Sequence, residues 1–236
     1  MKITIIRHAD PDYENNTLTP IGFKEREALG KHFKMEPHSE VYVSPLARAR
    51  LTAEAITKKF MICDWLQEFV YPVYMKETNE EHLTWDFLPS FYLNKKELYD
   101  IDKYLDTDLM KSGNIKHYYE HVCNEFDKIL AKHGYVRKNN YYEVKKESLD
   151  EVIFVCHFGM MTVLMSHLMN IPHTILGMTT CCAPTGITRF VSEEREKGIS
   201  HFRCLCFSDT SHLALEGYSP SFAGRFCEIF TSNDRH

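Results

Sequence analysis

Short apolar runs of strand length recur along the chain. Residues 3–6 are Ile-Thr-Ile-Ile, residues 40–43 are Glu-Val-Tyr-Val, and residues 151–156 are Glu-Val-Ile-Phe-Val-Cys. Unbroken runs of β-branched and apolar side chains are typical of strands that are buried on both faces of a sheet. Residues 186–192 and 201–207 indicate two further strands, which a charged turn joins into a hairpin that we expect at the edge of the sheet.

A helical pattern follows each of the first three runs. Thr19 and Pro20 have the chemistry of an N-cap and a first-turn proline, and they predict a helix over about residues 20–34. A Ser-Pro pair begins a second helical pattern over residues 44–60. Residues 160–170 are apolar on nearly all sides and predict a deeply buried helix. This alternation predicts an α/β fold with a mostly parallel central sheet flanked by helices.

Residues 70–149 interrupt the regular alternation. Tyrosines and charged residues are frequent there, and only residues 95–110 and 115–133 have helical patterns. The segment is too long to be a plain connection between two elements of a compact domain. We therefore expect a single domain over residues 1–236, in which residues 70–149 form a helical, aromatic-rich insertion that covers the active site as a lid.

Composition indicates an ordinary globular protein without a strongly charged surface. The chain has 236 residues, 44% of them hydrophobic, and a formal net charge of -5. This balance gives no indication of a nucleic acid or an anionic membrane as a partner. The apolar run at the N-terminus is too short for a signal peptide and no stretch is long enough to span a membrane, so we expect a cytoplasmic location. Nothing in the sequence indicates or excludes an oligomer.

The eight cysteines do not have the spacing of a metal site. None of them forms a Cys-x-x-Cys pair, and Cys156 and Cys206 lie in apolar runs, where reduced buried thiols are common. The adjacent pair Cys181 and Cys182 has two interpretations, a redox-sensitive site or buried packing, and the second is the more common. We expect neither a structural metal nor a disulfide framework.

Charged and titratable side chains stand where the predicted strands end. Arg7 and His8 follow the first run, Arg48 comes shortly after the second, His157 follows the third, and Glu68 lies in a weaker strand pattern around residues 65–69. Each of these residues alone is more often structural than catalytic. Because successive α/β elements bring the carboxyl ends of their strands to one edge of the sheet, we expect all five side chains to meet there. Two arginines and two histidines in one place are suited to binding phosphate.

Five segments carry a family resemblance. They are Arg7-His8-Ala9-Asp10, Leu18-Thr19-Pro20-Ile21-Gly22, Ser44-Pro45-Leu46-Ala47-Arg48-Ala49-Arg50-Leu51-Thr52-Ala53, Leu66-Gln67-Glu68 and His157-Phe158-Gly159. They resemble, in order, the Arg-His-Gly-Glu signature, the Leu-Thr-x-x-Gly helix start, the Ser-Pro-Leu-x-Arg-Ala-x-x-Thr-Ala block, the Leu-x-Glu motif and the second His-Gly segment of the histidine phosphatase superfamily, in its phosphoglycerate-mutase-like branch. The third segment is long and matches almost letter for letter.

The resemblance implies a three-layer fold and a reaction at His8. His8 would attack phosphorus and become a phosphohistidine, while Arg7, Arg48 and His157 would hold the phosphoryl oxygens. Glu68 would protonate the leaving alkoxide and then activate water. No metal ion or other cofactor is implied, because fixed cations can stabilise the charge. The expected partner is a small-molecule phosphate ester.

The sequence departs from the family pattern at three places. Ala9 replaces the signature glycine, and Phe158 replaces the first glycine after the second histidine, where it would narrow the pocket or add an apolar wall. The loop between His8 and Leu18 is shorter than usual for the family, so the asparagine with which the family helps to bind phosphate has no clear counterpart, and Asn15 and Asn16 are candidates for it.

Three functions remain open, and a phosphomonoester hydrolase is the one that we expect. A phosphoglycerate mutase would use the same pocket, but it would need fixed cations in the insertion to hold a carboxylate. The insertion contains lysines but a single arginine, Arg137, and many aromatic residues. A catalytically idle module that recognises phosphate is the second alternative, and it is disfavoured because His8, Glu68 and His157 are all present.

Overall fold

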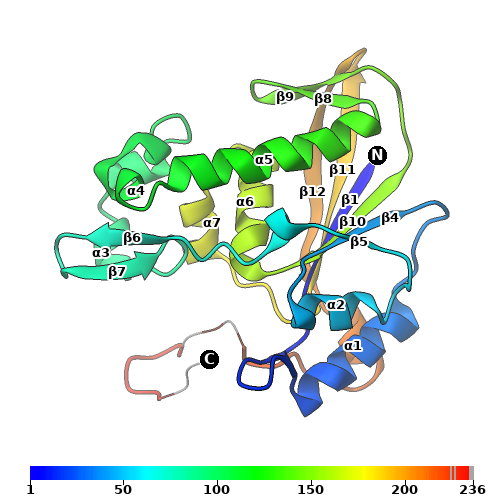
Figure 1. Ribbon diagram of the computed structural model, residues 1–236, viewed down its shortest axis with the longest axis horizontal. Coiled ribbons are helices and arrows are strands. Elements are labelled where there is room, and N and C mark those ends of the chain that lie inside the picture. Colours follow the sequence, from blue (N-terminus) through cyan, green and yellow to red (C-terminus); the bar gives the residue numbers. More distant parts are fainter. Residues whose placement is uncertain (224, 226, 234–236) are drawn as a thin grey trace.

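A mixed sheet runs through the molecule (Figure 1). The computed structural model describes residues 1–223, 225 and 227–233. Among these residues the eight strands of the sheet lie in the order β5 (Met61–Ile62), β4 (Glu40–Val43), β10 (Glu151–Cys156), β1 (Lys2–Arg7), β11 (Ile187–Glu196), β12 (Ile199–Asp209), β9 (Tyr141–Val144) and β8 (Tyr135–Lys138). Strands β5, β4, β10 and β1 are parallel, and the pairings from β1 onward to β8 are antiparallel.

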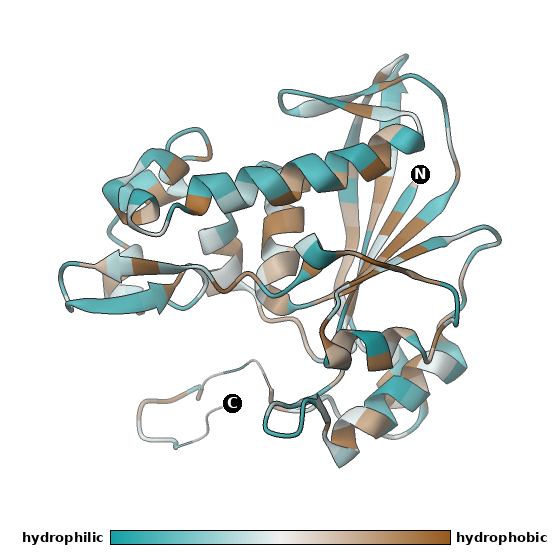
Figure 2. Ribbon diagram, in the orientation of Figure 1, coloured by the Kyte–Doolittle hydropathy of each residue, from teal (hydrophilic) through white to brown (hydrophobic). Residues whose placement is uncertain are grey.

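Helices cover both faces of this sheet, so the predicted α/β architecture is confirmed (Figure 1). One face carries α5 (Ile115–Lys132), α6 (Phe158–Met169) and α7 (His173–Thr179), and the other carries α1 (Pro20–His32), α2 (Ala47–Ala53) and α8 (Ser211–Leu215). Ile3 and Ile5 pack in the core on the first side and Ile6 in the core on the second, as alternation along a strand requires. Figure 2 shows apolar residues concentrated on the central strands and α6, with polar residues along α5.

The register between β1 and β10 is the feature that builds the site. The two strands are parallel, and Arg7 lies opposite Cys156. His8 and His157, the next residue on each chain segment, therefore leave the sheet side by side at its carboxyl edge. Both strands are almost entirely buried, which is why the sequence shows them as unbroken apolar runs.

Several predicted elements are confirmed and one helix is shorter than predicted. The helix from Pro20 ends at His32, and the Thr19 hydroxyl caps it by accepting from the Gly22 N–H at 3.0 Å. The helix expected over residues 44–60 is α2, which ends at Ala53. Ile56 and Phe60 still pack on the core, but from the irregular segment that follows. Their helical spacing therefore reflected burial and not helical structure.

Residues 65–69 do not form the expected strand. A 3-10 turn occupies Asp64–Leu66, and Glu68 follows it in irregular backbone. The turn forms because the N–H groups of Leu66 and Gln67 bond back to Cys63 and Asp64. The preceding strand β5 is only two residues long, so it ends before Glu68 is reached.

The insertion is mixed rather than helical. It begins with the hairpin of β6 (Pro72–Met75) and β7 (Glu80–Leu83) and ends with β8 and β9, which extend the central sheet. The predicted helix over residues 115–133 is confirmed as α5. The predicted helix over residues 95–110 is wrong, since that stretch contains two 3-10 turns, Lys96–Tyr99 and Tyr104–Asp106, and the beginning of the short helix α4 (Asp108–Ser112).

The β11–β12 hairpin does not form the edge of the sheet. Strand β11 pairs with β1 on its other side, and β9 pairs with β12 at Ile199 and Ser200. The edge beyond it is β8, a strand of the insertion, which the sequence pattern gave no reason to place there. In the part of the chain that the structure describes, no helix is long and apolar enough to cross a membrane.

Candidate active site

His8 and His157 form the centre of the site. Their ring centroids are 4.9 Å apart and the rings are tilted by 56°. Both side chains are buried. Burial lowers the pKa of each imidazole well below its usual value, and the arginines Arg7 and Arg48 lower both further. Both histidines are therefore neutral at physiological pH.

Arg48, in the first turn of α2, joins the two rings. Its Nε lies 3.3 Å from Nε2 of His8 and 3.2 Å from Nδ1 of His157. An arginine can only donate, so these two ring nitrogens are acceptors and carry no proton. The remaining ring nitrogens agree with this assignment: Nδ1 of His8 lies 2.7 Å from the Ala9 carbonyl oxygen, and Nε2 of His157 lies 2.7 Å from Oγ of Ser44.

Arg7 is buried beside the histidines. Its Nη1 donates to the carbonyl oxygens of Cys182 and, at 3.3 Å, Ala223. Its Nε has no hydrogen-bond partner among the described residues. Its guanidinium carbon lies 5.9 Å from the centre of the Phe158 ring, so Phe158 forms the apolar wall that its position after His157 suggested. A buried, unsatisfied N–H beside two imidazoles is a donor that an anion could satisfy.

Glu68 reaches the site although it does not lie on a strand. Its Oε1 accepts the N–H of Phe69 at 2.8 Å and the N–H of Met160, in the first turn of α6, at 3.0 Å. Burial raises the pKa of the carboxyl group, while those two N–H groups and the cations Arg7 and Arg48 oppose the rise. The net effect is an acid that holds its proton to a higher pH than an exposed glutamate does.

Thr52 and Thr185 support the signature loop. The Ala9 N–H donates to Oγ1 of Thr52 at 2.9 Å, and that hydroxyl donates to the Arg48 carbonyl oxygen. The Thr185 N–H donates to the Arg7 carbonyl oxygen at 3.1 Å. Thr185 itself has a left-handed backbone conformation, with a φ of 57°. Thr52 belongs to the long motif and could have been found there. Thr185 carries no sequence signal that would show this role.

Asn15 and Asn16 are not part of the cluster. Asn15 is exposed and its side-chain amide donates to Asp12 at 2.9 Å, while Asn16 lies in an exposed turn with a φ of 52°. Among the described residues, no hydrogen bond joins either asparagine to the two histidines or the two arginines. Tyr13, from the same loop, contacts the site instead, since its ring centre is 5.2 Å from the Arg48 guanidinium carbon.

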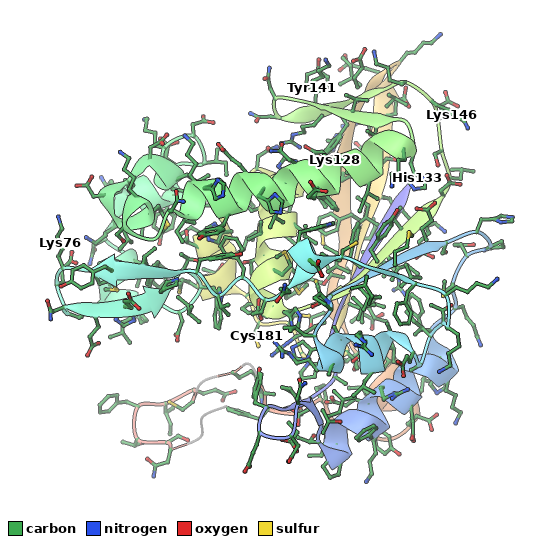
Figure 3. All side chains as sticks on the ribbon, viewed as in Figure 1. Lys76, Lys128, His133, Tyr141, Lys146 and Cys181 are labelled. Carbon is green, nitrogen blue, oxygen red and sulfur yellow. The ribbon has the colours of Figure 1, made fainter. Side chains whose placement is uncertain are left out.

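The cysteines near the site differ in their surroundings. Cys182 is fully buried, and burial raises the pKa of its thiol to about 11. Cys181, in the loop after α7, is exposed (Figure 3). In the described part of the chain, no three His, Cys, Asp or Glu side chains lie close enough together to hold a metal ion.

Several solved structures that share this fold are named as phosphatases. A phosphoserine phosphatase from Entamoeba histolytica, in complex with 3-phosphoglyceric acid, matches with a TM-score of 0.57 and 20% identity over 90% of this chain and 98% of that chain. The protein YhfR from Bacillus stearothermophilus matches with a TM-score of 0.56 and 17% identity, over 89% and 98%. A mycobacterial glucosyl-3-phosphoglycerate phosphatase matches with a TM-score of 0.54 and 14% identity, over 86% and 96%.

At these identities the structures establish the fold alone, and the evidence on the family comes from a sequence match to part of the chain. No curated protein sequence matches the chain significantly. Residues 3–95 match the model of the histidine phosphatase superfamily (branch 1), and this segment contains the signature at Arg7 and His8, the Arg48 block and Glu68. The resemblance carried by the motifs in this segment is thereby confirmed: residues 3–95 match the histidine phosphatase superfamily, and the chain as a whole shares its fold with the solved structures named above.

Proposed function

We propose that the chain is a phosphomonoester hydrolase that works through a phosphohistidine on His8. The observation that carries this proposal is the pair of contacts at the His8 ring. Nδ1 donates its proton to the Ala9 carbonyl oxygen at 2.7 Å, so the lone pair of Nε2 faces Arg48 and His157. A neutral imidazole held in one tautomer, with cations beside its free nitrogen, is a prepared nucleophile for phosphorus.

The two arginines would bind the phosphoryl group, with the ring of His157 beside them. Arg48 and the unsatisfied Nε of Arg7 offer N–H donors next to Nε2 of His8, and His157 lies on the remaining side. Phosphoryl transfer needs mainly positioning and charge stabilisation, which fixed donors in a buried site provide. As the bond from Nε2 to phosphorus forms, the bond from phosphorus to the ester oxygen breaks.

Glu68 would carry the protons of both steps. In the first step its protonated carboxyl gives a proton to the departing alkoxide, which leaves as an alcohol. In the second step the carboxylate takes a proton from water as the water oxygen attacks phosphorus, and the bond to Nε2 of His8 breaks. A pKa raised by burial suits the first step, since the carboxyl then keeps its proton to a higher pH than an exposed glutamate would.

The surroundings of the site favour hydrolysis over phosphoglycerate mutation. Arg137, the one arginine between residues 70 and 149, lies on β8, where its side chain donates to Asn170 at 2.8 Å and packs on Tyr142. Figure 1 shows β8 above α5, on the opposite side of that helix from α2 and from the carboxyl ends of β1 and β10. We therefore take residues 1–236 as one domain whose insertion borders the site with aromatic residues rather than with arginines.

A substrate panel with one variant tests the proposal. Phosphoserine and 3-phosphoglycerate, which two of the similar solved structures contain, are assayed beside sugar phosphates, nucleotides and an aryl phosphate. His8→Ala should abolish phosphate release from every ester that the wild type hydrolyses. Turnover that persists in His8→Ala would overturn the mechanism. Tight binding of inorganic phosphate without turnover of any ester would instead support the alternative of an idle recognition module.

A further inference from the structure

Trp85, a residue of the insertion, lies against the active site. It follows strand β7 and is partly buried. Its ring centroid is 6.3 Å from that of Phe158, at 80°, and Phe158 in turn lies beside Arg7. The two aromatic residues together border the side of the site on which Glu68 lies.

Two glycines allow this close approach. A Cβ atom on Gly159 would lie 2.5 Å from Nε1 of Trp85 and 2.7 Å from Oε1 of Glu68. The indole and the carboxylate therefore both lie against the backbone of Gly159. A Cβ atom on Gly177 would lie 2.5 Å from Cβ of Trp85. Distances under 3.0 Å leave no room for a side chain at either position. The tryptophan therefore lies directly on α6 and α7, with its indole next to Glu68.

The indole N–H fixes the backbone beside Glu68. Nε1 of Trp85 donates to the carbonyl oxygen of Phe69 at 3.0 Å, and the N–H of Phe69 donates to Oε1 of Glu68 at 2.8 Å. One peptide segment thus connects the indole to the carboxyl group. A change at Trp85 would disturb both the apolar cover of Glu68 and one of its two backbone donors.

A buried hydrogen-bond chain holds Trp85 in place. Oγ1 of the preceding residue, Thr84, lies 2.9 Å from Nε2 of His173, and Nδ1 of His173 lies 3.1 Å from the Tyr104 hydroxyl. All three side chains are buried. Burial lowers the pKa of His173 to about 3, so this link stays neutral over the working pH range. Thr84 and Tyr104 come from the insertion and His173 from α7. These hydrogen bonds therefore fix the insertion to α7 next to Trp85.

We propose that Trp85 is a positioning residue for the proton-transfer step, which its indole serves by covering Glu68 and by holding the Glu68-Phe69 backbone. The inference rests on the proposed role of Glu68 as proton donor. The insertion then supplies part of the environment of the reaction. Protonation of the leaving group depends on a carboxyl that is kept from water, and the indole provides that exclusion.

The other groups that face Glu68 act in different directions. Arg7 from β1 and Arg48 from α2 favour the carboxylate, and the buried thiol of Cys156 lies close enough to interact with it electrostatically. These groups stay in place when Trp85 is replaced. Loss of the indole reduces the burial of the carboxyl, which is the largest cause of its raised pKa, and this outweighs the opposite effect of a loosened Phe69 N–H, so the pKa of Glu68 should fall.

The test is a direct titration of Glu68 in the free enzyme. The carboxyl resonance of ¹³C-labelled Glu68 is identified by its absence in Glu68→Gln and followed with pH in wild type and Trp85→Leu. We expect the midpoint to fall by at least about half a pH unit, which corresponds to about threefold in the protonated fraction on the basic side. Phe91→Leu is the matched control, because its ring packs on Phe87 and Lys95 within the same insertion. It should leave the midpoint unchanged.

Trp85→Phe keeps the test decisive if the leucine variant does not fold. It removes the N–H and part of the ring system, and we expect a smaller shift in the same direction. A Glu68 midpoint that is unchanged in the folded variants would overturn the inference. If the midpoint falls but the pH dependence of ester hydrolysis does not follow it, the effect of Trp85 on Glu68 stands, but the proton-donor role of Glu68 fails and with it the catalytic purpose of that effect. If the pH dependence of hydrolysis follows the Glu68 midpoint, but replacing Trp85 leaves that midpoint unchanged, Glu68 is the proton donor and Trp85 does not position it.

Discussion

Nε of Arg48 lies 3.3 Å from Nε2 of His8, and the same N–H is shared with Nδ1 of His157 at 3.2 Å. One guanidinium thus fixes the tautomer of two imidazoles that burial keeps neutral. Arg48 comes from the first turn of α2, whereas the two histidines follow β1 and β10. The site is therefore assembled from three separate parts of the chain.

The Arg48 guanidinium should matter for the geometry of its donors as well as for its charge. Arg48→Lys keeps the positive charge but cannot present Nε–H and two further N–H groups in one plane. We predict that kcat falls by about 100-fold or more, with a smaller change in KM, because donors aimed at the transferred phosphoryl group act mainly in the transition state. Arg50→Lys, at an exposed position of the same helix, is the control. A kcat for Arg48→Lys within a few fold of wild type would contradict the arrangement.

The buried carboxyl of Glu68 should lower the free energy of unfolding of the wild type, relative to Glu68→Gln, by an amount that depends on pH. Oε1 accepts both backbone N–H groups, so Glu68→Gln can keep both bonds while removing the ionisable group. The folded-state pKa is raised, so the wild type loses stability relative to the variant as pH rises from the unfolded-state value through the folded one. The difference should reach about 1.4 kcal/mol for each unit of the shift and stay constant above it.

Denaturant unfolding of both proteins between pH 4 and 8 measures this difference. Equal stability is expected at the acidic end and a more stable Glu68→Gln at the neutral end. A gap that narrows as pH rises would mean that the folded protein favours the carboxylate, and that Glu68 is not suited to donate a proton.

The cluster of arginines and histidines should suffice without a metal ion. Its donors satisfy the charge requirements of phosphoryl transfer by themselves. We predict that excess EDTA, followed by its removal, leaves the rate of ester hydrolysis within experimental error. A large loss that a divalent cation restores would show that a metal ion takes part.

The sequence revealed the positions at which the site side chains leave the sheet, because strands buried on both faces show themselves as apolar runs. Arg7, His8 and His157 were found for that reason, and the long motif pointed to Arg48. The sequence did not reveal the register of β1 against β10, because the backbone hydrogen bonds that pair the strands do not depend on which side chains they carry. Glu68 was assigned to a strand that does not exist, but its carboxylate still lies at the start of α6, the helix that follows His157.

The insertion was the least predictable part, for a physical reason. Its short 3-10 turns are stabilised by long-range contacts such as that between Tyr104 and His173, and such contacts have no local pattern. The link between Trp85 and Glu68 depends on two glycines in other helices, Gly159 and Gly177. Asn15 could not be excluded in advance, because its bond to Asp12 is a matter of turn geometry.

The most direct test of the account is to trap the phosphoenzyme. Glu68→Gln is mixed with an aryl phosphate, whose weakly basic leaving group needs little protonation, so that phosphorylation proceeds while the attack of water is slowed. Rapid quenching in base followed by peptide mass spectrometry should find the phosphoryl group on His8, and the double variant with His8→Ala should carry none. A phosphoryl group on another residue, or a wild type that hydrolyses esters with no His8-bound phosphate in any variant, would contradict the mechanism.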